Sequence, residues 1–468
     1  MPPAVLAALL AVFVAFAPAL HAQEATRPAP PGRLLVMSDV HFDPMAAPQL
    51  VDRLAAAAPG DWRAVLDGAG TGFGSYGKDT TWPLLRSAVE AMRQTLPHPE
   101  MVLLPGDFLA HHYRASFNAA AKDHSDAAYR GFVRNTIQFL ALELERAFPA
   151  VPILPVLGNN DDDCGDYQLQ PNGPFLADAL PVLRSLLGNA GLEPGFEQDW
   201  TSYGNASVKV EGLRILLLDT VVFSRNYRDA CGGPPAADPG GATLAWLGDE
   251  LAAARRAHEP VWLVYHIPPG IDGYATWRQG MCPDRVIPMW KESYAEAFAA
   301  LLKRYPGTVA AEFAGHTHMD DFRLLGPAGG NFGFVIITPA LSPIFGQNPA
   351  FRTVAYDRAG GILDETTYDL TNLPQAGANA SPQWRAEYTF TQAWGLPRVD
   401  LPSLERLYTM IATQPQDRAR WHTLFPVSSP VYWRMSSDKP TAIRSYDCAT
   451  GHISPAAFAE CWCGGATK

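Results

Sequence analysis

Short apolar runs, several followed at once by polar residues, constrain this chain more than any other feature of its sequence. The runs occupy residues 34–37, 101–104, 153–157, 213–218, 261–265, 309–313 and 334–337. Runs this short and this continuously apolar are typical of strands that are buried on both faces. Residues 205–210, followed by Leu213, predict a hairpin, so the sheet is expected to be mixed.

Helical patterns separate several of these runs. They cover residues 82–95, 127–148, 175–187, 243–258 and 290–305. The alternation predicts an α/β fold with helices packed on the faces of a sheet. Residues 372–382 are rich in Pro, Ala, Gly and Asn, and residues 404–413 form the clearest helical pattern after them. We therefore expect a linker and then a small helical appendage.

Five polar clusters come directly after apolar runs. They are Asp39-Val40-His41, Gly106-Asp107, Gly158-Asn159-Asn160-Asp161, His266 and Gly315-His316-Thr317-His318. Loops at the carboxyl ends of strands converge on one edge of a sheet, so these clusters are expected to form one site. Taken alone, Asp39 and His41 could be turn or cap residues. Together, the Asp, His and Asn side chains predict a site for two divalent metal ions.

The N-terminal residues are typical of a secretion signal. Residues 5–17 form an uncharged apolar run, and the small residue Ala22 precedes Gln23. The run is short for a membrane span, so cleavage near Ala22 and export to the periplasm or the exterior are preferred over a membrane anchor. No transmembrane segment is expected after cleavage. The formal net charge of -11 argues against a nucleic acid partner.

Six cysteines in an exported chain predict up to three disulfides. Proximity in the sequence favours the pairs Cys448–Cys461 and Cys231–Cys282, and it leaves the partners of Cys164 and Cys463 open. A zinc site at Cys461 and Cys463 is less expected, because ligand pairs usually have wider spacing.

The polar motifs resemble those of the calcineurin-like metallophosphoesterase superfamily, in the same order, over residues 33–340. A closer resemblance, to the acid sphingomyelinase-like phosphodiesterases, covers nearly the whole mature chain. It rests on residues 106–111 (GDFLAH), 266–270 (HIPPG), 338–343 (TPALSP) and 348–352 (NPAFR), and on the cysteines near the C-terminus. The resemblance implies a sandwich of two mixed sheets flanked by helices, with a small helical C-terminal appendage. The expected divisions are a signal peptide (1–22), a metallophosphoesterase domain (23–371) and a C-terminal subdomain with cysteines (383–468).

The resemblance also implies a role for each site residue. One metal would be held by Asp39, His41 and His318, the other by Asn159, His266 and His316, and Asp107 would bridge the two. Both ions are expected to be zinc, with manganese or iron as alternatives. A hydroxide between the metals would attack phosphorus, and His111 would act as general acid toward the leaving group.

One motif departs from the superfamily, because Asn160 stands where a histidine is usual. Asn160 cannot supply a titrating proton, but it can hydrogen-bond a phosphoryl oxygen. The Gly-Asn-Asn-Asp sequence also resembles that of endopolyphosphatases, so hydrolysis of polyphosphate or phosphomonoesters is the alternative within enzymes. Outside enzymes, the alternative is a member that binds phosphoesters without turnover. We favour an exported phosphodiesterase for small diesters or phospholipid headgroups, and peripheral contact with a membrane is compatible with it.

Two further expectations concern residues near the motifs. Asp162 and Asp163 are expected to be solvated loop acids. The aromatic residues around His266, namely Tyr265, Tyr274, Trp277 and Trp290, are expected mainly in the core or at a rim. One or two of them could present a cation–π face to a quaternary ammonium group.

Overall fold

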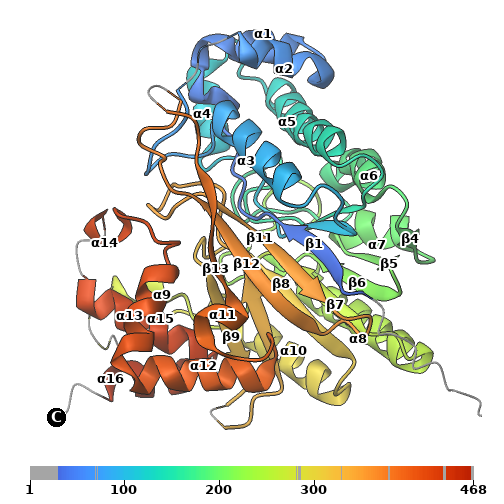
Figure 1. Ribbon diagram of the computed structural model, residues 1–468. Helices are drawn as coiled ribbons and strands as arrows, with labels where there is room; N and C mark the ends of the chain where they lie inside the picture. Colours follow the sequence, from blue (N-terminus) through green and yellow to red (C-terminus); the bar gives the residue numbers. More distant parts are fainter. Residues whose placement is uncertain are drawn as a thin grey trace, which may run out of the picture. The chain divides into compact units, whose positions relative to one another are not determined.

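Two mixed β-sheets pack together in the computed structural model, which describes residues 30–464 except 69, 71, 281, 283–285, 328, 378–379 and 436–438 (Figure 1). The predicted signal peptide, residues 1–22, lies outside the described residues. The six-stranded sheet has the order β13 (Trp384–Thr389), β12 (Ile362–Leu370), β11 (Ala350–Tyr356), β1 (Gly32–Val36), β2 (Met101–Leu104), β3 (Ile153–Pro155). The seven-stranded sheet has the order β4 (Gly191–Leu192), β5 (Ala206–Val210), β6 (Leu213–Leu218), β7 (Val261–Tyr265), β8 (Val309–Ala314), β10 (Gly333–Ile337), β9 (Asp321–Leu325).

In the first sheet, parallel strands lie at one edge and antiparallel strands at the other, whereas the second sheet has a parallel centre and antiparallel outer strands. Strands β1, β2 and β3 are parallel, with Leu35 opposite Val102 and Leu103 opposite Leu154, and β11 runs antiparallel to β1. Strands β6, β7 and β8 are also parallel, and β5 and β6 form the predicted hairpin. Between the sheets, the ring of Trp262 on β7 meets that of Tyr356 on β11 with centroids 4.8 Å apart. The predicted sandwich of mixed sheets is therefore confirmed.

Helices cover the sheets on their outer sides. Helices α3 and α6 contact β11 and β3 of the first sheet, and α8 contacts β6 of the second. The helices before the C-terminal region are α1 (Val51–Ala56), α2 (Trp62–Asp67), α3 (Trp82–Thr95), α4 (Tyr113–Ala120), α5 (Asp126–Ala147), α6 (Pro174–Leu187), α7 (Phe196–Tyr203), α8 (Pro239–Ala257), α9 (Gly273–Trp277) and α10 (Glu292–Arg304). Helix α8 begins four residues before its predicted start because Asp238 caps it, accepting a bond from the Gly241 amide, and Pro239 follows the cap.

The C-terminal appendage is helical, as predicted. It contains α11 (Phe390–Trp394), α12 (Leu401–Thr413), α13 (Pro415–Leu424), α14 (Tyr432–Met435), α15 (Lys439–Gly451) and α16 (Pro455–Cys463). Helix α15 contacts α9 and β9, so the appendage packs beside the second sheet (Figure 1). The predicted domain boundary between residues 371 and 383 lies between β12 and β13, which pair in one sheet, and it stays a prediction.

The disulfides partly differ from the predicted pairs. Cys448 and Cys461 are bonded, as predicted, but the pair Cys231–Cys282 is wrong. Cys231 is bonded to Cys164, and Cys282 to Cys463. Proximity in the sequence failed here because the fold brings the loop after β3 to the loop after β6, and α16 to the segment after α9.

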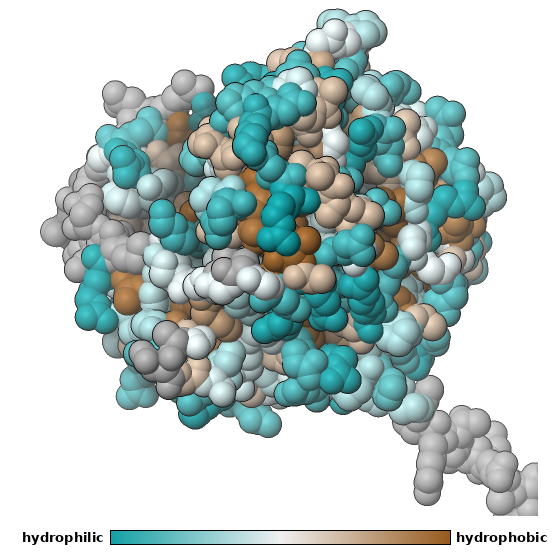
Figure 2. Space-filling model, turned by 90° about the horizontal axis from the view of Figure 1, so that it is seen from above, coloured by the Kyte–Doolittle hydropathy of each residue, from teal (hydrophilic) through white to brown (hydrophobic). Residues whose placement is uncertain are grey.

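The surface on the side of α1 and α2 is a mosaic of hydrophilic and hydrophobic side chains, with the hydrophobic ones in small groups (Figure 2). Among the described residues, no helix combines the length and apolar character needed to cross a membrane.

Candidate metal centre

The seven predicted metal ligands come from both sheets and lie where their parallel strands end. Asp39 and His41 follow β1, Asp107 follows β2, and Asn159 follows β3. His266 follows β7, and His316 and His318 follow β8. All seven side chains are buried or nearly so, and they converge at the carboxyl ends of the parallel strands of the two sheets.

The loops that carry these ligands have unusual backbone conformations. Five of the ligands have positive φ angles, a region that non-glycine residues rarely occupy: Asp39 (49°), His41 (42°), Asp107 (58°), His316 (71°) and His318 (65°). Such conformations cluster at functional sites, where surrounding contacts enforce them. No sequence pattern indicates these conformations, since none of the five residues is a glycine.

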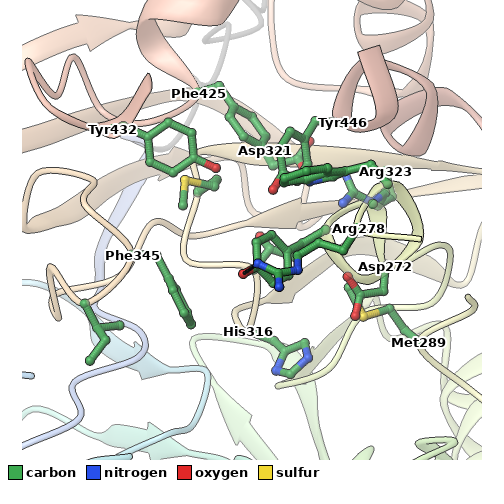
Figure 3. Close-up of a pocket in the computed structure, with 16 residues that line it drawn as sticks. Asp272, Arg278, Met289, His316, Asp321, Arg323, Phe345, Phe425, Tyr432 and Tyr446 are labelled. Atoms are coloured by element: carbon green, nitrogen blue, oxygen red, sulfur yellow. Dashed lines mark hydrogen bonds and ion pairs between the residues drawn. The ribbon is translucent and has the colours of Figure 1, made fainter. Parts of the chain in front are cut away.

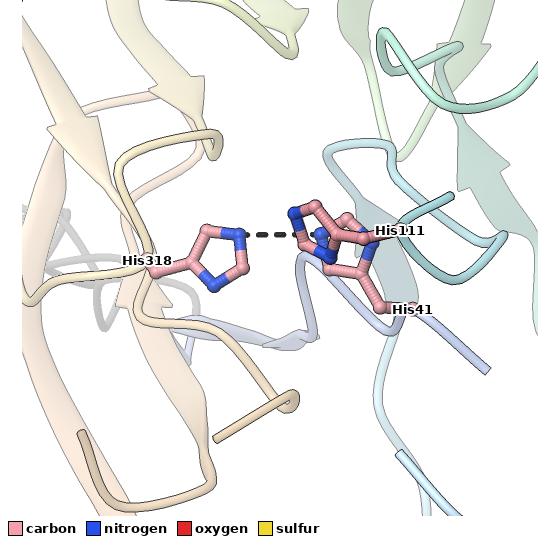
Figure 4. A group of neighbouring side chains, drawn as sticks. All are labelled: His41, His111 and His318. Atoms are coloured by element: carbon pink, nitrogen blue, oxygen red, sulfur yellow. Dashed lines mark hydrogen bonds between the residues drawn. The ribbon is translucent and has the colours of Figure 1, made fainter. Parts of the chain in front are cut away.

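The first group of ligand atoms belongs to Asp39, His41, His318 and Asp107. The Nε2 atoms of His41 and His318 are 3.2 Å apart (Figure 4). Asp39 Oδ1 is 3.4 Å from His318 Nε2, and Asp107 Oδ2 is 3.3 Å from His41 Nε2. These four residues match the predicted first metal site with its shared aspartate.

The second group belongs to Asn159, His266, His316 and the same Asp107. His266 Nε2 lies 3.2 Å from Asp107 Oδ2, 3.1 Å from Asn159 Oδ1 and 3.3 Å from His316 Nδ1. Asp107 Oδ2 therefore faces both groups. The amide nitrogen of Asn159 donates to Asp166 Oδ1 at 2.8 Å, which turns the amide oxygen toward the histidines.

The chemistry of these contacts suits cations. His41 Nδ1 donates to the Leu109 carbonyl at 2.9 Å, and His266 Nδ1 donates to the Pro105 carbonyl at 2.7 Å. In the neutral rings, the Nε2 atoms then carry lone pairs, and both face Asp107 Oδ2, which is also an acceptor. Ligand atoms bound at about 2.1 Å to one tetrahedral ion lie roughly 3.4 Å apart, so the observed spacings fit a metal in each group.

The protonation states also suit metal binding. Burial lowers the pKa of His41 to about 4 and that of His316 to about 3, so both rings are neutral ligands at pH 7. Burial acts in the same direction on His266, but the Asp107 carboxylate outweighs it and raises the pKa of His266 to about 9. A proton on His266 thus neutralises Asp107 in the metal-free protein, in the place that a cation would occupy.

His111, the predicted general acid, lies beside the first group. Its ring stacks on that of His41 with centroids 4.0 Å apart (Figure 4). Its Nδ1 donates to Asp79 Oδ1 at 3.0 Å, and its backbone amide donates to Asp79 Oδ2 at 2.8 Å. Burial alone would lower the pKa of His111, but the hydrogen bond to Asp79 and the negative charges of Asp79, Asp107 and Asp39 together raise it. Asp79 had not been predicted, because no motif surrounds it and it is distant from His111 in the chain.

Asn160 and Asp161 hold the ligand loops. The backbone amide of Asn160 donates to Asp107 Oδ1 at 2.9 Å, and its side-chain amide donates to Asp107 Oδ2 at 3.0 Å. The Asp161 carboxylate accepts four backbone N–H bonds, from Asp107, Phe108, Leu109 and Gly158. Gly158 also leaves the space that Asp107 fills, because a Cβ there would overlap the Asp107 carboxylate.

Asp162 and Asp163 are buried, so the expectation that they are solvated loop acids is wrong. The disulfide Cys164–Cys231 draws their loop against the loop after β6 and covers it. Among the aromatic residues around His266, Tyr265 and Trp290 are fully buried in the core. Tyr274 is exposed and lines a cavity that His316 also lines.

A family model described as calcineurin-like phosphoesterase matches residues 32–320. The chain is 27% identical over 451 residues to an acid sphingomyelinase-like phosphodiesterase of Mus musculus, covering 92% of this chain and 90% of the relative. It is 26% identical over 394 residues to a cyclic GMP-AMP phosphodiesterase of Rattus norvegicus, covering 82% of this chain and 81% of the relative. A dimetal phosphatase of Danio rerio aligns with a TM-score of 0.42 and 15% identity, over 72% of this chain and 95% of that one.

Proposed function

Because the chain belongs to the calcineurin-like phosphoesterase family, we propose that it is an exported phosphodiesterase that uses two divalent metal ions. Membership of this family makes the protein a metal-dependent phosphoric ester hydrolase. The names of its relatives, which include a sphingomyelinase-like and a cyclic dinucleotide phosphodiesterase, favour diesters as substrates. The observation that carries the proposal is the single carboxylate oxygen, Asp107 Oδ2, that lies between two groups of ligand atoms.

Asp39, His41 and His318 would hold one ion, Asn159, His266 and His316 the other, and Asp107 would contact both. We propose zinc, because six of these seven donors are histidine nitrogen or carboxylate oxygen atoms, which zinc prefers. Manganese and iron are the alternatives. When bound, such ions activate water and neutralise charge on phosphoryl oxygens. The donors are neutral apart from two carboxylates, which leaves net positive charge for an anionic phosphoester.

The chain's own residues position the reacting groups. Asn160 directs both of its N–H donors at Asp107, so we assign it the role of orienting that carboxylate. The predicted contact between Asn160 and a phosphoryl oxygen stays a prediction. Asp161 fixes the backbone of the loops that contain Asp107 and Gly158. Asn159 and Asn160 have amide side chains, so neither can act as a titrating histidine.

His111 would protonate the leaving group. Asp79 occupies its Nδ1, which leaves Nε2 as the atom that can carry a proton toward the substrate. The ring lies against His41, so this proton would be delivered at the edge of the first ligand group. A general acid is required when the leaving group is an alkoxide, because an alkoxide is a far poorer leaving group than an alcohol.

Export is supported by the three disulfides, since such bonds persist in oxidising compartments. An oxidising compartment also agrees with the signal peptide expected at residues 1–22. The proposed substrates are small soluble diesters or the headgroups of phospholipids. We propose no nucleic acid partner.

The deciding experiment compares hydrolysis of bis-p-nitrophenyl phosphate with that of p-nitrophenyl phosphate by the zinc-loaded protein. We expect a clear preference for the diester in kcat/KM. A preference for the monoester would overturn the proposal in favour of a phosphatase. Metal occupancy without hydrolysis of either ester would instead indicate a binding protein.

A further inference from the structure

A cavity of about 410 Å³ opens beside the metal centre (Figure 3). His316 forms part of its wall, and the C-terminal appendage contributes Phe425, Tyr432 and Tyr446. Ligand sites for small molecules typically have volumes of roughly 300–1,000 Å³, so the cavity has room for a group about the size of a nucleoside. Because His316 belongs to both the ligand cluster and the cavity wall, a group attached to phosphorus can extend from the cluster into this cavity.

An exposed aromatic ring joins the cavity to the centre. Phe345 lines the cavity, and its ring centroid lies 4.6 Å from that of His318 and 5.7 Å from that of His111. Phe345 is 47% exposed, and Tyr274, which also lines the cavity, is 51% exposed. Large aromatic side chains left this exposed beside a reactive centre are suited to contact a ligand.

The charged residues of the cavity differ in whether they have partners. Asp321 and Arg323 form an ion pair with each other. Asp272 caps α9 by accepting a bond from the Ala275 amide, and burial raises its pKa. Arg278 has no ion pair with any described residue; its guanidinium contacts the Tyr274 hydroxyl at 3.4 Å and lies over the Tyr274 ring. Among the described residues that line the cavity, Arg278 is thus a cation without an ion pair, whereas Arg323 is paired with Asp321.

We propose that this cavity binds one of the two groups on phosphorus and that Arg278 makes it select a group with a negative charge of its own. The proposal rests on the proposed phosphodiesterase function and narrows its substrate class. An anionic group would exchange the hydration of Arg278 for a charge-assisted hydrogen bond.

The same geometry argues against a quaternary ammonium headgroup. Such a group would need the face of an aromatic ring, and Tyr274 and Phe345 are the exposed large aromatic rings among the described residues that line the cavity. The Arg278 guanidinium carbon already lies 5.7 Å from the Tyr274 ring centroid, so a second cation there would meet a like charge. Of the two substrate chemistries that the sequence leaves open, the wall formed by Tyr274 and Arg278 therefore favours small diesters over choline headgroups.

The kinetic test uses three p-nitrophenyl diesters that differ in the second group. They are p-nitrophenyl phosphocholine, thymidine 5′-(p-nitrophenyl phosphate) and the same thymidine compound with a 3′-phosphate. The 3′-phosphate should raise kcat/KM in the natural protein. Arg278→Gln should lower kcat/KM for the compound with the 3′-phosphate about tenfold and should change kcat/KM for the compound without it little. Arg278→Glu should improve phosphocholine relative to the 3′-phosphate. The control is Arg255→Gln, because Arg255 lies on α8 outside the cavity.

A binding test separates this inference from the proposed function. Calorimetry of the zinc-loaded protein would compare thymidine 3′,5′-bisphosphate with thymidine 5′-monophosphate. The inference would be supported if the bisphosphate bound more tightly than the monophosphate and Arg278→Gln abolished this difference. This result would support it even if no diester were hydrolysed. Equal binding of the two nucleotides, or a ratio that Arg278→Gln leaves unchanged, would overturn it even in an active phosphodiesterase.

Discussion

The Asp161 carboxylate is the best place to test how this protein holds its ligand loops. It is 1% exposed, and each oxygen accepts two backbone N–H bonds. Oδ2 accepts from Asp107 and Gly158 at 2.8 Å each, and Oδ1 accepts from Phe108 at 2.6 Å and from Leu109 at 3.1 Å. Asp161→Asn keeps one oxygen and replaces the other with an amide nitrogen, which cannot accept a hydrogen bond.

Two buried N–H groups would then face another donor. A hydrogen bond to a charged group contributes about 1.5–3 kcal/mol, so the loss in free energy of unfolding should be about 3–6 kcal/mol. This is a large share of the roughly 5–15 kcal/mol that stabilises a typical protein. Urea unfolding followed by circular dichroism, with disulfides intact and metals chelated, measures this loss. Zinc affinity should also fall, because the loops of both ligand groups are released.

Asp219→Asn is the matched control. Asp219 is fully buried, its Oδ1 accepts from the Val221 amide at 2.9 Å, and its Oδ2 has no partner among the described residues. The asparagine can keep the one bond and removes a carboxyl whose pKa burial raises to about 7. We expect a change within about 1 kcal/mol. Equal losses for the two variants, or a loss under about 1 kcal/mol for Asp161→Asn, would refute the reasoning.

Other substitutions test the remaining roles. His111→Asn should slow hydrolysis of diesters with alkoxide leaving groups by about 100-fold or more, and should slow hydrolysis of p-nitrophenyl esters little. The control variant His112→Asn should slow neither reaction. Equal losses on both kinds of ester would exclude His111 as the general acid. Asp107→Asn should abolish activity and lower zinc content measured by atomic absorption, and full activity with normal zinc would contradict the bridging role. Burial raises the pKa of Glu312 from 4.5 to about 8, so the folded protein keeps a proton that the unfolded chain releases in this window. The free energy of unfolding should therefore fall as pH rises from about 4.5 to about 8, by up to about 1.4 kcal/mol per pH unit. Glu312→Gln should reduce this fall, measured by urea unfolding at about pH 5 and about pH 8. If the variant showed the same fall as the natural protein, the assignment to Glu312 would be contradicted.

Strands that are apolar throughout could be predicted from the sequence, as could β6 and β8, which each bury one charged residue within an otherwise apolar run. Residues 101–104 are β2 at the predicted bounds, because burial on both faces leaves no polar position. Strand β11 was missed because Arg352 interrupts its apolar pattern. The structure buries that arginine and pairs it with Asp320 and Glu365, a compensation between distant segments that a local pattern cannot reveal.

The candidate site shows the same division. The ligand types could be predicted because each follows an apolar run, and parallel strands bring such residues to one edge. The bond from His111 to Asp79 and the exposed position of Phe345 depend on which loops the fold brings together. Arg278 carried no signal either, since an arginine in a loop is ordinarily solvated and its importance comes only from the cavity beside it.

The contacts that shape the ligand cluster involve groups other than the ligand atoms themselves. Asp161 holds the backbone of Asp107, a glycine at 158 admits the Asp107 side chain, and backbone carbonyls orient His41 and His266. These contacts keep aspartate and histidine residues at positive φ, which is unfavourable for each of them alone. Hydrogen bonds among the loops at the ends of the strands thus offset these unfavourable backbone conformations. The loops therefore hold the donor atoms at the spacing of a metal site. A protein built in this way presents its ligands to the ions already arranged, which favours tight binding because little ordering remains to be done when the ions arrive.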